Sequence, residues 1–139
     1  SEMCIRDSNH ADLSEMRLAP CAYSMTFNVT GNRLNAILNQ RSQDMLTANN
    51  WNVCQYAALL IMFAKSTGFE PGELVHVIAD AHIYDRHIDA VKRLIEKKPY
   101  PAPEMQVEDI TDFYKFTKNS FTAVDYKYHE FTDKIPVAI

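Results

Sequence analysis

The chain has 139 residues, 47% of them hydrophobic and 11% aromatic, which suits one compact core rather than two independent domains. Its formal net charge of −4 excludes the broad basic surface that holds a nucleic-acid backbone, so we expect no nucleic-acid partner. The longest apolar run, residues 56–64, is about half the length that crosses a bilayer, so we expect no membrane partner either.

The cysteines indicate the compartment. Cys4, Cys21 and Cys54 form neither a disulfide framework nor a CxxC zinc motif. Because this usage is typical of reducing surroundings, we expect a cytoplasmic protein.

The first pattern along the chain predicts a β-hairpin. Residues 1–7 have no periodicity and do not lead into it, so we interpret them as a non-native segment. Residues 21–29 then alternate in polarity, which predicts a strand. Five of its side chains share one face: Cys21, Tyr23, Met25, Phe27 and Val29. Turn residues at 30–33 lead into a second alternating run at 34–39, which completes the hairpin.

A helix and a long strand are expected next. Apolar residues keep helical spacing from Val53 to Ala64, and Gly68 suits the end of the helix. Three residues near its start are candidate caps: Asn49, Asn50 and Asn52. Residues 74–84 return to period two and predict a strand. One face of this strand carries three polar side chains: Asp80, His82 and Tyr84.

The remaining patterns complete an α+β fold. A second amphipathic helix is expected from His87 to Lys97, before the prolines of residues 99–103. Four of its side chains are expected to face inward: Ile88, Val91, Leu94 and Ile95. Aromatic residues between Phe113 and Phe131 favour one or two further strands. The fold class is α+β, a mainly antiparallel or mixed β-sheet packed by α-helices.

Two candidate groups flank the hairpin. Cys21 follows Pro20 at the start of a strand, where an element end can expose and orient a nucleophile; burial as a small apolar side chain is the alternative. Arg41, Ser42 and Asp44 follow the second strand, and a guanidinium beside a hydroxyl suits a phosphate dianion. An arginine near the thiol would also favour the thiolate. The alternative for this triplet is a strand-end cap with a surface ion pair.

The other candidates are Asn52, His82 and Tyr84. A carboxamide carries a donor and an acceptor, so Asn52 can pair with the O4 and N3–H edge of uracil, whereas cytosine presents the opposite pattern. Its alternative role is a helix cap. His82 and Tyr84 project two residues apart from one strand face and can reach one ligand hydroxyl, or be satisfied within the sheet. We expect no metal, because the histidines lack a standard ligand spacing.

Five segments, in their order and spacing, resemble thymidylate synthase. They are Leu18-Ala19-Pro20-Cys21, Gln40-Arg41-Ser42-Gln43-Asp44, Asn52, Asp80-Ala81-His82-Ile83-Tyr84 and Pro136-Val137-Ala138-Ile139. The resemblance runs over residues 8–139 and implies the C-terminal portion of a thymidylate synthase domain, with the N-terminal half missing. It also implies a homodimer in the full-length protein.

The resemblance implies a reaction and its substrates. Cys21 is implied to attack C6 of dUMP in a reductive methylation to dTMP, with 5,10-methylenetetrahydrofolate as the co-substrate. Arg41 and Ser42 are implied to hold the 5′-phosphate, and Asn52 to read the uracil edge.

The resemblance also assigns the remaining candidates. His82 and Tyr84 are implied to bind the deoxyribose 3′-hydroxyl. Asp44 is implied to contact both the nucleotide and the folate, and Ala138 and Ile139 to bind the folate.

Three alternative hypotheses remain. The chain is a non-catalytic fragment that binds nucleotide or dimerises through its sheet, or it is a dUMP hydroxymethylase, in which water takes the place of hydride. Asn52 argues only against a dCMP version of that enzyme. A cysteine hydrolase built on Cys21 and His82 would need an oxyanion-hole loop, for which the sequence has no signature.

Overall fold

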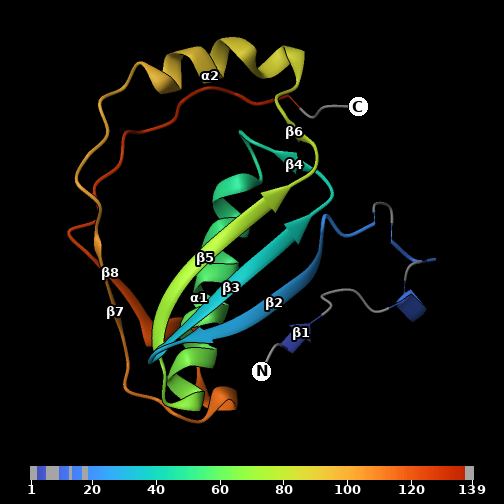
Figure 1. The fold of residues 1–139 in the computed structure, drawn as a ribbon. Helices are drawn as coiled ribbons and strands as arrows, with labels where there is room; N and C mark the ends of the chain where they lie inside the picture. Colours follow the sequence, from blue (N-terminus) through green and yellow to red (C-terminus); the bar gives the residue numbers. More distant parts are fainter. Residues whose placement is uncertain (1–2, 6–9, 13, 17–18, 137–139) are drawn as a thin grey trace.

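The chain folds around one mixed β-sheet with a long helix packed against it (Figure 1). A computed structural model describes residues 3–5, 10–12, 14–16 and 19–136. Within them the strands are β1 Met3–Ile5, β2 Ala22–Thr30, β3 Arg33–Gln40, β4 Gln43–Asp44, β5 Glu70–Ile78, β6 Ala81–His82, β7 Glu104–Val107 and β8 Phe121–Val124. The helices are α1 Asn49–Thr67 and α2 Ile88–Ile95, and short 3-10 helices span His10–Asp12, Asp85–His87, Phe113–Lys115 and Lys118–Ser120.

The central sheet has the strand order β1-β2-β3-β5. Its strands β2 and β3 form the predicted antiparallel hairpin, whose turn holds Gly31 at φ 60°. Glycine adopts this left-handed conformation without a steric penalty. The chain then crosses through α1 to β5, which pairs in parallel with β3. The predicted α+β class with a mixed sheet is therefore confirmed.

A β-bulge at the start of β2 changes which side chains face the core. Ala22 pairs with Gln40 and Ser24 pairs with Asn39, so Tyr23 is the extra residue. Ala22 is buried with Met25, whereas Tyr23 is 47% exposed. The prediction that Tyr23 shares the Met25 face was wrong, because an inserted residue inverts the alternation. Cys21 precedes the bulge and for the same reason does not share that face either.

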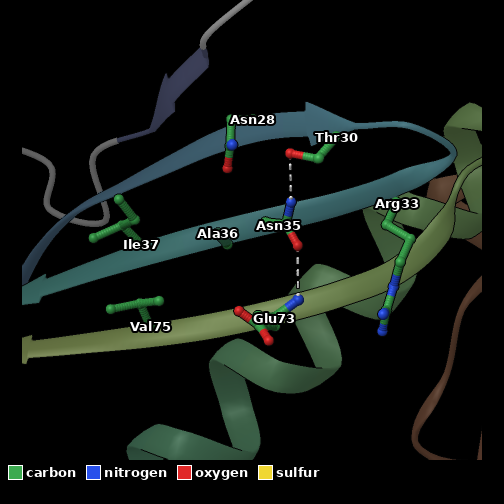
Figure 2. A pocket seen from close by; sticks show the side chains of 8 residues that line it. All are labelled: Asn28, Thr30, Arg33, Asn35, Ala36, Ile37, Glu73 and Val75. Carbon is green, nitrogen blue, oxygen red and sulfur yellow. Dashed lines mark hydrogen bonds between the residues drawn. The ribbon is translucent and has the colours of Figure 1, made fainter.

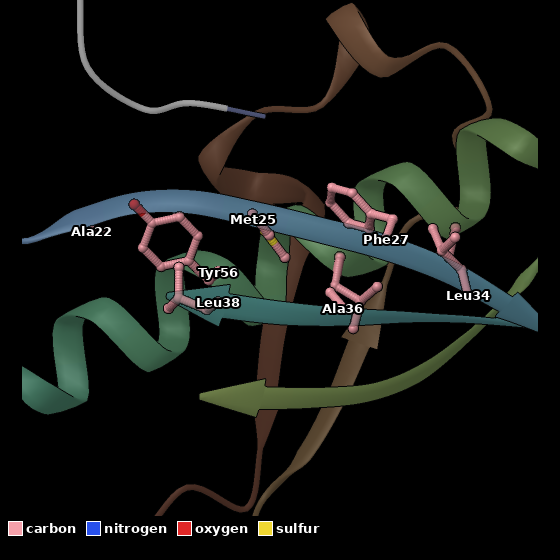
Figure 3. Packing of buried hydrophobic residues seen from close by; sticks show 9 residues of the cluster. Ala22, Met25, Phe27, Leu34, Ala36, Leu38 and Tyr56 are labelled. Atoms are coloured by element: carbon pink, nitrogen blue, oxygen red, sulfur yellow. The ribbon is translucent and has the colours of Figure 1, made fainter. Parts of the chain in front are cut away.

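The core lies between the sheet and α1 (Figure 3). Its buried side chains are Ala22, Met25, Phe27, Leu34, Ala36 and Leu38 from the sheet and Tyr56, Leu60 and Ala64 from α1. The three helix residues recur every fourth position and so form one stripe on α1. The aromatic ring of Phe27 meets that of Phe63 edge to face, with the centroids 5.1 Å apart.

Helix α1 ends as predicted but begins differently. Gly68 closes it at φ 77°, and its N–H bonds to the Lys65 carbonyl at 3.4 Å. At the start, Ala48 is the N-cap residue and makes no side-chain cap. The asparagine-cap prediction was therefore wrong for Asn49, Asn50 and Asn52. Instead, Asp44 accepts hydrogen bonds in the turn that precedes the helix.

The strand predicted over residues 74–84 is two strands. The first, β5, begins earlier, at Glu70, and ends at Ile78; the second, β6, pairs with β4. Between them, the Ala79 N–H bonds to the Gln40 carbonyl at 3.0 Å, and the Asp80 carbonyl accepts the Gln43 N–H at 2.9 Å. The chain therefore changes partner from β3 to β4, which its own alternation does not reveal.

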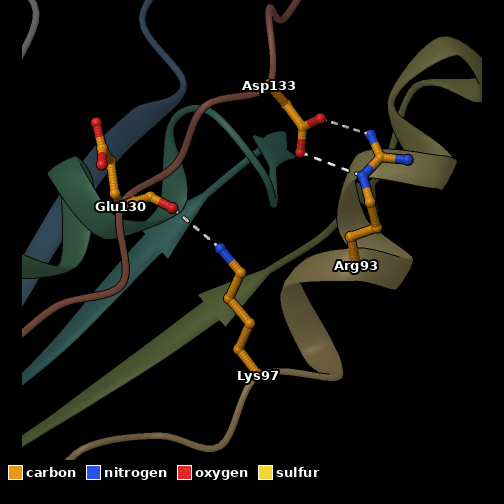
Figure 4. Close-up of polar contacts among 4 residues, drawn as sticks. All are labelled: Arg93, Lys97, Glu130 and Asp133. Atoms are coloured by element: carbon orange, nitrogen blue, oxygen red, sulfur yellow. Dashed lines mark hydrogen bonds and ion pairs between the residues drawn. The ribbon is translucent and has the colours of Figure 1, made fainter.

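Helix α2 is shorter than predicted, and its apolar face is exposed. Ile88, Leu94 and Ile95 are 39%, 40% and 74% exposed, so the prediction that they face inward was wrong. The C-terminal segment lies along this helix and is anchored by polar contacts (Figure 4). Arg93 Nη2 lies 2.7 Å from Asp133 Oδ1, and the Lys97 ammonium donates to the Glu130 carbonyl at 3.0 Å. Amphipathic spacing predicts an apolar face but does not supply its partner.

A second, smaller sheet pairs β7 with β8 in antiparallel fashion. Strand β8 confirms the prediction of a strand in the aromatic region, whereas β7 was missed because three of its four residues are exposed and give no alternating pattern. In the described part of the chain no helix is long and apolar enough to span a membrane.

Replacing Gly72 with alanine should destabilise the β3–β5 pairing. An alanine Cβ would lie 2.7 Å from the Leu34 carbonyl oxygen and closer still to Asn35 Oδ1. Asn35 cannot turn away without losing the bond it accepts from the Glu73 N–H at 3.0 Å (Figure 2). We expect Gly72→Ala to lower the free energy of unfolding in urea by about 1–3 kcal/mol. Glu73→Ala is the matched control with an exposed side chain, and equal losses in both variants would contradict the clash.

Candidate active site

Seven predicted site residues converge on one pocket of about 220 Å³. They are Cys21, Arg41, Ser42, Asp44, Asn52, His82 and Tyr84, and Gln43 and Ala48 complete the lining. The two remaining predicted residues, Ala138 and Ile139, lie outside the described residues. A larger hollow of about 410 Å³ over β2, β3 and β5 contains none of the seven (Figure 2). The smaller pocket is therefore the candidate active site.

The strand directions explain why these residues meet. Strands β3 and β5 are parallel, so both end at the same edge of the sheet. Arg41 and Ser42 follow β3, while β6 carries His82 just beyond β5. The antiparallel β2 begins at this edge and places Cys21 there. Open sheets with parallel strands bind ligands at such carboxyl ends.

Arg41 anchors the backbone that carries Cys21. Its Nε donates to the Pro20 carbonyl at 3.1 Å and its Nη2 to the Ala19 carbonyl at 2.6 Å. Its backbone N–H donates to the Cys21 carbonyl at 2.9 Å. Cys21 is itself half-buried and lines the pocket, which differs from burial in the core. The arginine and the thiol are thus brought to one place, with two of the five guanidinium N–H groups holding the cysteine segment.

The Asp44 carboxylate is held in a turn before α1. Its Oδ1 accepts the N–H groups of Leu46 at 2.9 Å and Thr47 at 3.2 Å, and its Oδ2 accepts the Thr47 hydroxyl. Burial alone would raise the pKa of Asp44, but the bonds from Thr47 and Leu46 outweigh it and lower that pKa. Asp44 is therefore a fixed, ionised acceptor at neutral pH.

His82 and Tyr84 lie together beside this turn. Their ring centroids are 5.1 Å apart in an edge-to-face arrangement, and Asp80 Oδ2 lies 3.3 Å from His82 Nδ1. The carbonyl of His82 accepts the Met45 N–H at 3.0 Å, which joins this strand to β4. The three polar residues of the predicted strand thus remain neighbours although the strand is interrupted.

A polar cluster behind the pocket was missed by the sequence analysis. Gln40 and Gln43 are each 1% exposed, and Gln40 contacts His76 and Asn52 as well as Gln43. The signal was present, because Gln40 continues the inward-facing series of Leu34, Ala36 and Leu38 at every second position. A polar residue at such a position requires buried partners.

A second missed residue is His87, which is 2% exposed. Its Nε2 lies 2.9 Å from the Pro136 carbonyl, and its ring lies 5.6 Å from that of Tyr84. It therefore joins the pocket wall to the last described residue of the chain. The sequence pattern predicted that the second helix begins at His87, but it did not indicate that this side chain is buried.

Burial lowers the pKa of His76 below its usual 6.5. The unfolded chain takes up a proton near pH 6.5 while the folded chain resists it, so the stability contributed by neutral His76 falls as the pH drops below 6.5. Below the pKa of His76 in the folded chain, both states carry the proton and the stability no longer changes with pH through this residue. We expect His76→Gln, which keeps a donor, to flatten the dependence of urea unfolding on pH between about 7.5 and 5.5. The same slope in both proteins would contradict this.

A family model described as thymidylate synthase matches residues 1–139. The chain belongs to the thymidylate synthase family. The thymidylate synthase of Bacillus phage phi3T is 40% identical over 121 residues, which are 86% of this chain and 43% of that protein. The thymidylate synthase of Bacillus atrophaeus is 39% identical over 121 residues, 86% of this chain and 53% of its own length.

The solved structures agree with this assignment. The thermostable thymidylate synthase A from Bacillus subtilis matches with a TM-score of 0.85 and 36% identity, over 98% of this chain and 48% of that one. The chain therefore spans about half the length of the thymidylate synthases it matches. The resemblance inferred from five segments is confirmed. The interpretation of residues 1–7 as non-native and of residues 8–139 as a C-terminal portion stays a prediction.

Proposed function

We propose that this pocket is the nucleotide site of a thymidylate synthase, which methylates dUMP to dTMP with 5,10-methylenetetrahydrofolate and uses Cys21 as its nucleophile. The observation that carries the proposal is the convergence of seven residues from separate segments on one small pocket with Cys21 in its wall. Every curated relative named above is a thymidylate synthase, which favours methylation over hydroxymethylation.

The phosphate end of the nucleotide is assigned to Arg41 and Ser42. Arg41 uses guanidinium N–H groups to bond the Ala19 and Pro20 carbonyls, and its other N–H groups remain for a ligand. Together with the neighbouring Ser42 hydroxyl, they can bind a phosphate dianion. The sugar is assigned to the neighbouring His82 and Tyr84, whose side chains both line the pocket.

The reacting end of the nucleotide is assigned to Cys21 and Asn52. The Cys21 thiolate forms a bond to C6, and the electrons of the C5–C6 double bond move to C5 and onto O4. The Asn52 amide can donate to O4 and accept from N3–H, so it stabilises the charge that develops there. Uracil C5 thereby becomes a nucleophile.

The folate, when bound, supplies the one-carbon unit and the hydride. Asp44 is the described residue assigned to it, since an ionised acceptor in a fixed turn suits the N–H groups of a pterin. Ala138 and Ile139 are the other two residues assigned to the folate. We also propose a cytoplasmic homodimer, for which the exposed Ile37, Val75 and Val77 on the sheet offer an apolar surface; sedimentation tests the dimer.

Trapping the reaction half-way tests the proposal on the chain itself. With 5-fluoro-dUMP and methylenetetrahydrofolate, the C5 fluorine cannot leave as a proton does, so the covalent complex should persist. Intact-mass measurement should show the chain plus both ligands, and peptide mapping should place them on Cys21. The absence of both an adduct and dUMP binding in calorimetry would reject the proposal for this chain.

A further inference from the structure

Residues 129–136, which we name the C-terminal strap, run along α2 in the opposite chain direction (Figure 4). Their contacts with α2 and its flanking residues pair successive strap residues with successively earlier helix residues. The pairs are His129 with Lys98, Glu130 with Lys97, Asp133 with Arg93, and Pro136 with His87. The strap is therefore held along its whole length and in one register.

The strap has little slack between its contacts. From Lys97 back to His87 the largely helical chain rises about 15 Å, at roughly 1.5 Å per residue. From Glu130 to Pro136 a fully extended chain spans at most about 20 Å. Because the two lengths are similar, the position of the last strap residue is determined by α2.

The contact between Arg93 and Asp133 is the strongest of the four. Arg93 donates from Nη2 to Asp133 Oδ1 at 2.7 Å and from Nε to Oδ2 at 3.3 Å. Both partners are charged and the geometry is bidentate, whereas the other three pairs use a neutral backbone carbonyl as the acceptor. The Asp133 side chain is 30% exposed, so the pair is partly shielded from water.

Helix α2 has few other means of attachment. Ala90 is its only buried residue, and the structure describes the whole of this helix. The strap and α2 therefore hold each other in place. Ala138 and Ile139 follow Pro136 by two and three residues in the sequence, so the strap leads directly to them.

We propose that Arg93 and Asp133 are positioning residues for the folate, because by fastening the strap to α2 they fix the point from which Ala138 and Ile139 continue. This inference rests on the proposed function, which assigns those two residues to the folate. Neither Arg93 nor Asp133 belongs to the lining of the pocket, so they act through the strap and not on the nucleotide.

Arg93→Ala tests the inference. It should raise the concentration of methylenetetrahydrofolate that gives half-maximal adduct formation with 5-fluoro-dUMP by about 3–5-fold, as expected for the loss of one well-formed ion pair. The affinity for dUMP, measured by calorimetry, should not change, whereas a general loosening of the fold would weaken both ligands. Arg93→Lys keeps the charge and should give a smaller rise.

The chain offers two controls. Lys92→Ala removes the same charge from the neighbouring exposed position of α2 and should leave both ligands unaffected. The double variant Arg93→Ala/Asp133→Ala should show the same rise as either single variant, because the two substitutions remove one shared contact. Rises that multiply in the double variant would show that the two residues act separately and would overturn the inference.

The outcomes separate the two proposals. If the unchanged chain neither forms the adduct nor binds dUMP, the proposed function fails and this inference with it. If the unchanged chain forms the adduct but Arg93→Ala needs no more folate, or loses dUMP affinity to the same extent, only the inference is overturned.

Discussion

Replacing Cys21 with alanine should abolish the covalent adduct with 5-fluoro-dUMP and methylenetetrahydrofolate. The rate should fall by at least about 10⁴-fold, as is typical when a nucleophile is removed. The Ser42 hydroxyl also lines the pocket, but a hydroxyl without an adjacent base is a far weaker nucleophile than a thiolate. Intact-mass spectrometry over time measures the rate, and calorimetry should show that dUMP still binds within a few-fold.

The chain offers a matched control for this substitution. Cys54 lies on α1, is exposed and is not part of the pocket lining. Cys54→Ala should therefore form the adduct at the unchanged rate. An adduct that survives in Cys21→Ala and disappears in Cys54→Ala would contradict the assignment of the nucleophile.

Phe27→Ala should cause the largest loss of stability among single substitutions in the sheet. Its ring is 2% exposed and contacts Phe63 of α1, so truncation removes buried surface and leaves a cavity at the sheet–helix junction (Figure 3). We expect the free energy of unfolding to fall by about 3–5 kcal/mol, measured in urea. A folded domain typically has about 5–15 kcal/mol of stability in total, so this loss is between about a fifth and the whole of it.

Tyr23→Ala is the informative comparison for Phe27→Ala. Simple alternation places Tyr23 and Phe27 on one face, but the bulge leaves Tyr23 47% exposed. We therefore expect a loss under about 1 kcal/mol. A loss as large as that of Phe27→Ala would contradict the bulge.

Local patterns predicted the elements whose causes are local. The hairpin follows from alternation around Gly31, and the end of α1 follows from a left-handed glycine at Gly68. Strand patterns singled out Cys21, His82 and Tyr84 as candidates, but only the order of separate motifs grouped all seven pocket residues into one predicted site. Their convergence needs the parallel β3–β5 pairing, which no single motif contains.

The sequence predictions that were wrong share one physical cause: each of these features depends on a partner that is distant in the sequence. The bulge at Tyr23 is defined by the register of β3, and the split of the predicted 74–84 strand is defined by its change of partner to β4. The exposed face of α2 depends on what lies opposite it. Gln40 was predictable as a buried polar residue, but its bonds to His76 required the fold.

The bulge at Tyr23 also has a consequence for sequence variation among relatives. Because its side chain is outside the core, position 23 should accept many residue types. Its backbone, however, supplies the extra residue between Ala22 and Ser24 that keeps Ala22 inward and Cys21 at the pocket. Deleting this one residue would shift Cys21 by one place and turn it away. Substitutions should therefore be common at this point, and length changes absent.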